Sequence, residues 1–147
     1  SMQLGVPARR NIKNKDVIAG KKLFFELSCN SCHTEKFVTG THSDFDNLNQ
    51  QTIYPYSDFL LHDMGEGLSD DLPEYRASGN EWRTTPLWGI GLTEVVSGRK
   101  TYLHDGRARN LLEAILWHGG EANRARMEFE KLDKIQINQL LNFLNSL

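Results

Sequence analysis

One short segment, Cys29-Asn30-Ser31-Cys32-His33, constrains this chain more than any other feature of its sequence. Two thiols three residues apart on a turn point the same way, so they can add to the two vinyl groups of a haem, and the histidine that follows can ligate the iron. The chain has no other cysteine, which leaves none for a disulfide framework. The segment therefore predicts one covalent haem c, anchored by Cys29 and Cys32, with His33 as the proximal iron ligand.

The cysteine pair has three other interpretations. A thioredoxin-like pair would need a preceding strand in a βαβ context, which the sequence does not suggest. A zinc site would need two more ligands at suitable spacing, and no second cysteine pair exists. A scaffold without haem would result if the chain were made in a reducing compartment that lacks haem-attachment machinery.

Length, composition and charge narrow the class of protein further. The 147 residues suit one domain. A hydrophobic content of 39% and a mean hydropathy of -0.51 predict a modest core, to which a haem would add apolar surface. The net charge of -2 and the absence of a long Lys/Arg run argue against nucleic-acid binding. No apolar stretch approaches the roughly 18 residues of a transmembrane helix.

The sequence divides into an arm and one domain. Residues 1–15 are polar and basic, and we expect a flexible N-terminal arm in which Ser1-Met2 resembles the remnant of a removed tag. Residues 16–147 are expected to form a single domain that is mostly α, with long irregular loops.

Periodicity and capping residues predict where the helices lie in the sequence. Asp16, Asn110 and Asp133 are the expected caps of three helices: one from Val17 to about Leu27, one over residues 111–118, and the last in the chain. In the first of these, Gly20 should let another helix approach closely. Weaker signals suggest a turn or helix over 57–64, a helix over 84–91, an extended segment over 93–106 and a helix over 121–131. No alternating strand pattern stands out.

A six-coordinate iron would need a second ligand, and the sequence offers several: His42, His62, His104, His118, Met64 and Met127. His118 shares a helix face with apolar Ala114, and an imidazole on such a face needs a polar partner or a metal. Met64, just before Gly65, is a plausible loop ligand and is the main alternative.

Arginines and tryptophans near the expected site could contact the haem, although a structural role is the more frequent one for both residue types. Arg83, Arg107 and Arg109 could each pair with a haem propionate, although exposed arginines are commonplace. The tryptophans could relay electrons at the haem edge, although core packing is the more frequent role. They are Trp82, Trp88 and Trp117.

Four segments in order carry a family resemblance: CNSCH, YPYSDFLLHDMGEGLSD, EWRTTPLWGIG and YLHDGRARNLLEAILWHGGEA. Together they closely resemble the C-terminal part of bacterial di-haem oxidoreductases classed as thiol oxidoreductases or peroxidases. The resemblance covers about residues 17–147. The group is similar to the di-haem cytochrome c peroxidases, whose two cytochrome c-like domains carry one haem each.

The resemblance implies a cytochrome c-like haem domain that is one half of a di-haem protein, because the chain has a single attachment motif. Trp82-Arg83 and the segment 102–106 match two segments of the wider peroxidase pattern. His118 falls where those proteins place the distal ligand, often Met, so the resemblance favours His118 as distal ligand and Arg83 as a haem contact. Ligation by two histidines usually lowers the potential and closes both faces of the iron.

The expected function is electron transfer within a periplasmic or exported, cell-envelope-associated bacterial di-haem oxidoreductase. The partners implied are a second haem domain of the parent protein and a small redox protein that donates or accepts electrons. In that role the domain needs no catalytic residue of its own. The rival is a peroxidase that acts directly on peroxide, with His104 as an acid/base group.

Overall fold

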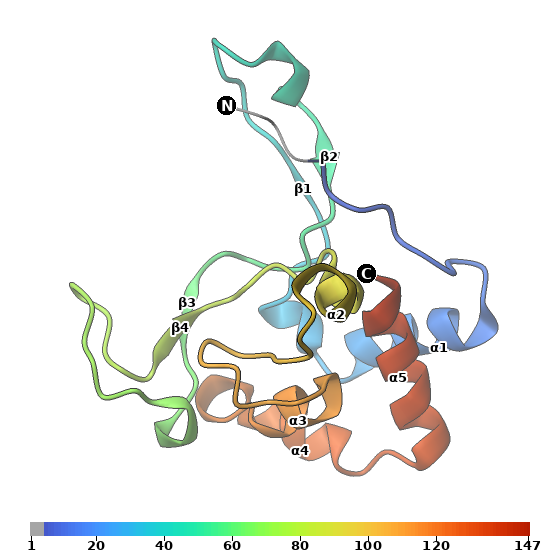
Figure 1. Cartoon of the computed structure of the whole chain (residues 1–147), viewed down its shortest axis with the longest axis vertical. Coiled ribbons are helices and arrows are strands. Elements are labelled where there is room, and N and C mark those ends of the chain that lie inside the picture. Colours follow the sequence, from blue (N-terminus) through green and yellow to red (C-terminus); the bar gives the residue numbers. More distant parts are fainter. Residues whose placement is uncertain (1–4) are drawn as a thin grey trace.

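The computed structural model describes residues 5–147, and within them helices hold far more of the chain than strands do (Figure 1). The five α-helices are α1 (Lys15–Glu26), α2 (Thr93–Ser97), α3 (Leu111–Leu116), α4 (Asn123–Phe129) and α5 (Lys134–Ser146). Two antiparallel pairs of very short strands accompany them: β1 (Phe37–Val38) with β2 (Thr52–Ile53), and β3 (Leu61–Asp63) with β4 (Glu81–Arg83). The expectation of a mostly α chain with long loops is met.

The core forms where α1 packs against α5, which lie side by side in Figure 1. A Cβ atom on Gly20 would lie 1.9 Å from the backbone oxygen of Gln139, so only glycine allows this approach. The predicted role of Gly20 is therefore confirmed. Around the helix pair, large apolar side chains are almost fully buried, among them Phe24, Tyr56, Leu140 and Phe143.

Two of the three predicted helix caps are confirmed. The Asn110 side chain accepts from the amide of Glu113, and Asp133 forms a capping box with Gln136. The third was wrong, because α1 begins two residues earlier than predicted and its cap is Asn14, whose side chain accepts from the amides of Asp16 and Val17. Asp16 instead lies in the first turn, where its charge favours the helix dipole.

Three of the weaker predictions were wrong. Residues 57–64 contain strand β3 instead of a helix, and residues 84–91 contain only the start of a 3₁₀ turn over Ile90–Leu92. The segment 93–106, expected to be extended, begins with α2. In each case the elements have three to five residues, too few for a periodic pattern to appear in the sequence.

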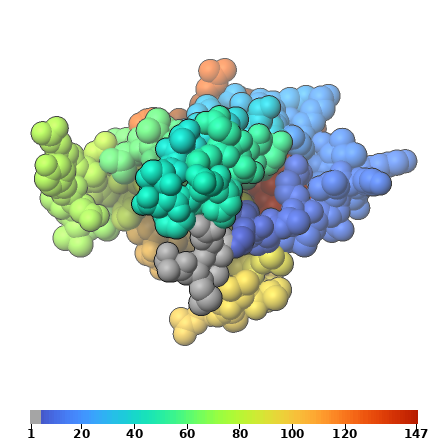
Figure 2. Space-filling model, turned by 90° about the horizontal axis from the view of Figure 1, so that it is seen from above, coloured from blue at the N-terminus to red at the C-terminus, as the bar shows by residue number. Residues whose placement is uncertain are grey.

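Two segments project from the helices. The segment joining β1 to β2 stands out from the rest and is seen end-on in Figure 2, and the segment joining β3 to β4 projects to one side in Figure 1. Residues 5–14 run past α5, where the Arg10 amide donates to the Ser146 carbonyl over 2.8 Å. Ser1-Met2 lies outside the described residues. None of the described helices has the length and apolar character needed to cross a membrane.

Candidate haem site

The attachment segment forms a tight turn directly after α1. Ser28 adopts a left-handed conformation with φ of 62°, and a 3₁₀ turn over Cys29–Ser31 follows. The amide of His33 donates to the Cys29 carbonyl over 3.0 Å, and the Cys32 carbonyl accepts from the Asp58 amide over 2.8 Å. These bonds hold both cysteines, unpaired and partly buried, at the end of the core helix.

His33 presents one ring nitrogen for a ligand. Its Nδ1 lies 2.9 Å from the backbone oxygen of Tyr56. A carbonyl can only accept, so Nδ1 carries the proton and Nε2 keeps its lone pair. Burial lowers the pKa of His33 to about 4, although the bond to Tyr56 opposes the shift. The ring is therefore neutral at physiological pH, which is the form that binds a metal.

His118 has the same arrangement at the end of α3. Its Nδ1 lies 2.7 Å from the backbone oxygen of Ala114, one helical turn earlier, so its Nε2 also keeps a lone pair. Burial lowers its pKa below the usual histidine value. The next two residues must be small, because a Cβ on Gly119 would lie 2.8 Å from the Met64 oxygen and one on Gly120 would lie 2.1 Å from the Asp63 oxygen.

The two imidazoles lie close together. Their ring centroids are 6.4 Å apart, with the ring planes inclined by 44°. For two imidazoles bound on opposite sides of one metal ion, metal–nitrogen bonds of about 2.0 Å and a further 1.1 Å or so to each ring centre give a separation of about 6 Å. The donor set and its spacing therefore fit a bis-histidine iron.

Exposed apolar side chains directly precede His118 or follow Asp58, whose amide is bonded to the attachment turn. Phe59 and Leu60 follow Asp58, which is bonded to the attachment turn, and Leu116 and Trp117 directly precede His118. Leu60 is 60% exposed and Trp117 is 42% exposed. Apolar surface gathered near a polar ligand pair is typical of a binding site for a largely apolar group.

The other predicted ligands lie elsewhere or have other partners. The His42 ring packs 5.1 Å from that of Phe45 in the segment joining β1 to β2. Met127 is half exposed on α4. Met64 is nearer to the site, because its backbone oxygen abuts Gly119. Among the predicted ligands, all of which the structure describes, His118 is the one whose ring contacts that of His33.

Arg83 lies in β4, and the His104 ring packs against the same strand. Arg83 is exposed and pairs in register with Leu61 of β3. The His104 ring stacks on Trp82 with centroids 3.5 Å apart and planes 9° apart, and the Trp82 indole donates to the Leu68 carbonyl over 2.9 Å. Arg83 thus directly follows, in sequence, the tryptophan of a stacked pair.

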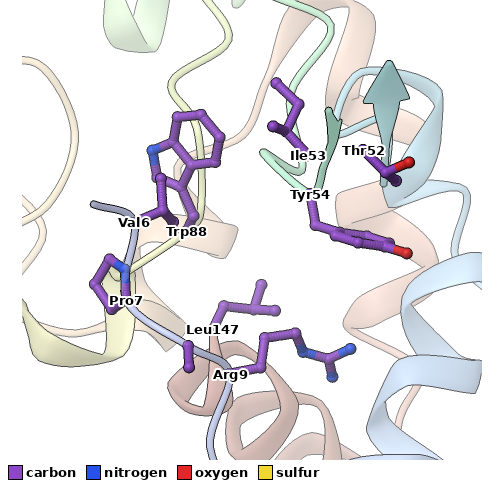
Figure 3. A pocket seen from close by; sticks show the side chains of 9 residues that line it. Val6, Pro7, Arg9, Thr52, Ile53, Tyr54, Trp88 and Leu147 are labelled. Carbon is purple, nitrogen blue, oxygen red and sulfur yellow. The ribbon is translucent and has the colours of Figure 1, made fainter. Parts of the chain in front are cut away.

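The remaining arginines and tryptophans are more widely spread. The Arg107 guanidinium lies 5.0 Å above the Trp117 ring and pairs with Asp105, while Arg109 pairs with Glu113. Trp88 is on another face of the molecule. There it lines an open cavity of about 270 Å³ with Tyr54, Arg9 and residues of the N-terminal segment (Figure 3).

Beside the attachment turn lies a hydrogen-bonded triad that the sequence did not predict: Asp58, His62 and Glu121. His62 Nε2 is 2.8 Å from an Asp58 carboxylate oxygen, and His62 Nδ1 is 2.8 Å from a Glu121 oxygen. The bond to Glu121, together with the charge of Asp58, raises the pKa of His62 despite partial burial. Glu121 is 59 residues from His62, and no local pattern in the sequence indicates such a contact.

The family is established by comparison. A family model described as "Di-haem oxidoreductase, putative peroxidase" matches residues 1–147, so the chain belongs to the di-haem oxidoreductase family. No curated protein and no solved structure matches it. Membership in this family supports a haem-binding redox role for the chain.

Proposed function

We propose that this chain is a cytochrome c-like domain that binds one covalent haem c and transfers electrons. Cys29 and Cys32 form the two thioether bonds, and His33 and His118 are the axial ligands. The haem supplies a one-electron couple, and the residues around it set how readily that couple is oxidised.

The observation that carries the proposal is the relation between His33 and His118. Each ring is oriented by a hydrogen bond from Nδ1 to a backbone oxygen, and the centroids lie 6.4 Å apart. In metal sites, the ring N–H of a histidine that does not face the metal commonly donates to a backbone oxygen or a carboxylate, which fixes the tautomer. Two residues 85 positions apart in sequence thus each keep one ring nitrogen unprotonated, and the distance between their ring centroids suits two ligands of one iron.

These residues favour electron transfer over substrate chemistry. Imidazoles on both faces leave no open coordination position, and rings fixed by backbone bonds need little movement when the charge on iron changes. The half-exposed indole of Trp117, adjacent to His118, gives the site an edge that a redox partner can approach.

The family description and the single attachment motif together support the proposal that the domain is part of a larger protein. A di-haem protein needs a second haem, and this chain offers one pair of cysteines. We therefore propose that the second haem lies in another domain of the parent protein, which works in the bacterial periplasm or cell envelope. A small redox protein would then deliver or remove electrons.

The rival function is direct reduction of peroxide, which the family description favours. It requires an iron with one open face and a proton donor beside it. In this interpretation His104 is the acid/base group. The His104 ring, however, is stacked on Trp82 and not on the ring of His33.

The test uses the chain matured with haem-attachment machinery in an oxidising compartment. Intact mass and a pyridine haemochrome spectrum should give one covalent haem per chain, and the electronic spectrum should be that of low-spin iron. A high-spin spectrum that shifts on addition of peroxide would favour the peroxidase. A chain without covalent haem under these conditions would refute both interpretations.

A further inference from the structure

A second set of metal-binding atoms lies against the haem-attachment turn. The Cys32 sulfur, an Asp58 carboxylate oxygen and a His62 ring nitrogen all lie within 4.8 Å of one another. The three residues come from two separate segments, which the bond from the Asp58 amide to the Cys32 carbonyl holds together. Sulfur, nitrogen and oxygen in one cluster form a donor set typical of zinc.

The size of the cluster suits a zinc ion after a small adjustment. Ligand atoms on a tetrahedral zinc lie roughly 3–4 Å apart, given bonds of about 2.0 Å to nitrogen or oxygen and about 2.3 Å to sulfur. Side-chain rotations that move the ligand atoms by about 1 Å would bring the present cluster to that spacing. All three residues are partly exposed, so an ion can reach them and a water can take the fourth position.

A carboxylate that could orient the histidine of such a site is already in position. Glu121 binds His62 at Nδ1, the nitrogen remote from the cluster, over 2.8 Å. The other Glu121 oxygen accepts from the Asp63 amide over 3.0 Å, which fixes the carboxylate. A carboxylate that holds the far nitrogen of a histidine directs Nε2 toward a metal and makes it a better donor.

We propose that the chain, before haem is attached, binds one Zn²⁺ ion through Cys32, Asp58 and His62, with Glu121 positioning His62. The ion replaces the thiol proton of Cys32 and the proton shared between His62 and Asp58, and both protons pass to solvent. Its two positive charges are matched by the Cys32 thiolate and the Asp58 carboxylate.

Zinc binding and haem attachment are mutually exclusive at Cys32, a consequence that rests on the proposed function. A thiolate bound to zinc cannot add to a vinyl group, and a thioether sulfur is a much poorer zinc ligand than a thiolate. The zinc form would therefore protect Cys32 until haem arrives.

The test uses the full chain prepared without haem and kept reduced. Calorimetry should show one Zn²⁺ per chain. Cobalt(II) used as a probe should give a sulfur-to-metal charge-transfer band in the near ultraviolet and visible bands of tetrahedral cobalt. Cys32→Ser should abolish the charge-transfer band. Asp58→Asn and His62→Gln should each weaken Zn²⁺ binding at least tenfold, and Glu121→Gln should weaken it about 10- to 100-fold.

Matched controls separate this site from a simple cysteine pair. His42→Gln, a histidine change in a projecting segment, and Cys29→Ser should each leave the affinity within threefold, with circular dichroism reporting the fold of every variant. Unchanged affinity in folded His62→Gln would overturn the proposal, as would the absence of stoichiometric binding. If haem attachment fails but zinc binding follows this pattern, only the proposed function is refuted.

Discussion

His118 and Ala114 are joined by a 2.7 Å hydrogen bond from the imidazole Nδ1 to the backbone oxygen one helical turn earlier. The bond turns the ring back along α3 and leaves Nε2 as its free nitrogen. His33 achieves the same result through Tyr56. In both cases a backbone oxygen, and not a side chain, orients the imidazole ring.

Removing the His118 ring should open one face of the iron. In the haem-loaded chain, we expect His118→Ala to convert the low-spin spectrum to a high-spin one and to let cyanide or imidazole bind readily. His118→Met should stay six-coordinate and raise the reduction potential, because a thioether favours the reduced iron.

The alternative ligand is tested in the same way. Met64→Ala should leave the spectrum low-spin, since the Met64 backbone, not its side chain, is what abuts Gly119. A low-spin His118→Ala together with a high-spin Met64→Ala would make Met64 the ligand.

The covalent anchors have a simpler test. The double change Cys29→Ala and Cys32→Ala removes both sulfurs, so a denaturing gel stained for haem peroxidase activity should show no band at the mass of the chain. Either single change should leave one thioether and a weaker band. Haem that stays covalently bound in the double variant would refute the attachment site.

The sequence predicted best the features that depend on residues close together in the chain. Asn110 and Asp133 were recognisable caps, and Gly20 marked a helix contact. Haem attachment at Cys29 and Cys32 stays a prediction that rests on their spacing alone. The choice of His118 as distal ligand, drawn from the apolar residues before it and from the resemblance to known proteins, also stays a prediction.

The features that escaped prediction depend on long-range contacts. Strands β3 and β4 have three residues each, too few for an alternating pattern, and their pairing brings together segments about 20 residues apart. The contact between His62 and Glu121 spans 59 residues. The partner of His33 is a backbone oxygen of Tyr56, which no side-chain pattern could reveal.

Gly20→Ala should destabilise the fold through overpacking. The added methyl would lie 1.9 Å from the oxygen and 2.5 Å from the carbon of the Gln139 backbone, so α5 would have to move away from α1. We expect a loss of about 3 kcal/mol in the free energy of unfolding, measured by chemical denaturation. Gly40→Ala, where an added Cβ meets nothing within 4 Å, should change it by less than about 0.5 kcal/mol. Equal effects of the two changes would disprove this packing argument.

Arg83 remains a predicted contact of a haem propionate, and its exposed position on β4 leaves it free to make one. Removing a positive charge near the haem favours the more positive, oxidised iron, so Arg83→Leu should lower the midpoint potential. A charge about 10–15 Å from the iron contributes roughly 1 kcal/mol, or about 40 mV for one electron. Arg76→Leu, in the segment between β3 and β4, is the matched control and should have no effect. An Arg83→Leu variant with unchanged potential would return Arg83 to an ordinary surface role.

The triad of Asp58, His62 and Glu121 should give the haem-free chain a stability that depends on pH. The bond to Glu121 and the neighbouring Asp58 raise the pKa of His62. The pKa of Glu121 is lowered by His62 and by the Asp63 amide, and that of Asp58 is lowered by hydrogen bonds that outweigh its burial. A raised histidine pKa stabilises the fold fully below the unfolded value of 6.5, and this contribution is lost as pH rises through the folded value. The lowered carboxyl values act in the opposite direction: their contribution is present above the ordinary carboxyl pKa and is lost as pH falls.

The two limits define a window in which the triad stabilises the fold most. The difference in melting temperature between the unchanged chain and His62→Gln should be largest between about pH 5 and pH 6.5, where the carboxylates and the imidazolium are all charged. It should shrink on the alkaline side as His62 loses its proton, and on the acidic side as the carboxylates gain theirs. His33 and His118, whose lowered pKa values also change stability with pH, are present in both chains, so the difference mainly reports His62. A difference that stays constant from pH 5 to pH 9 would mean that His62 contributes by packing alone and that its ring is not charged in the folded chain.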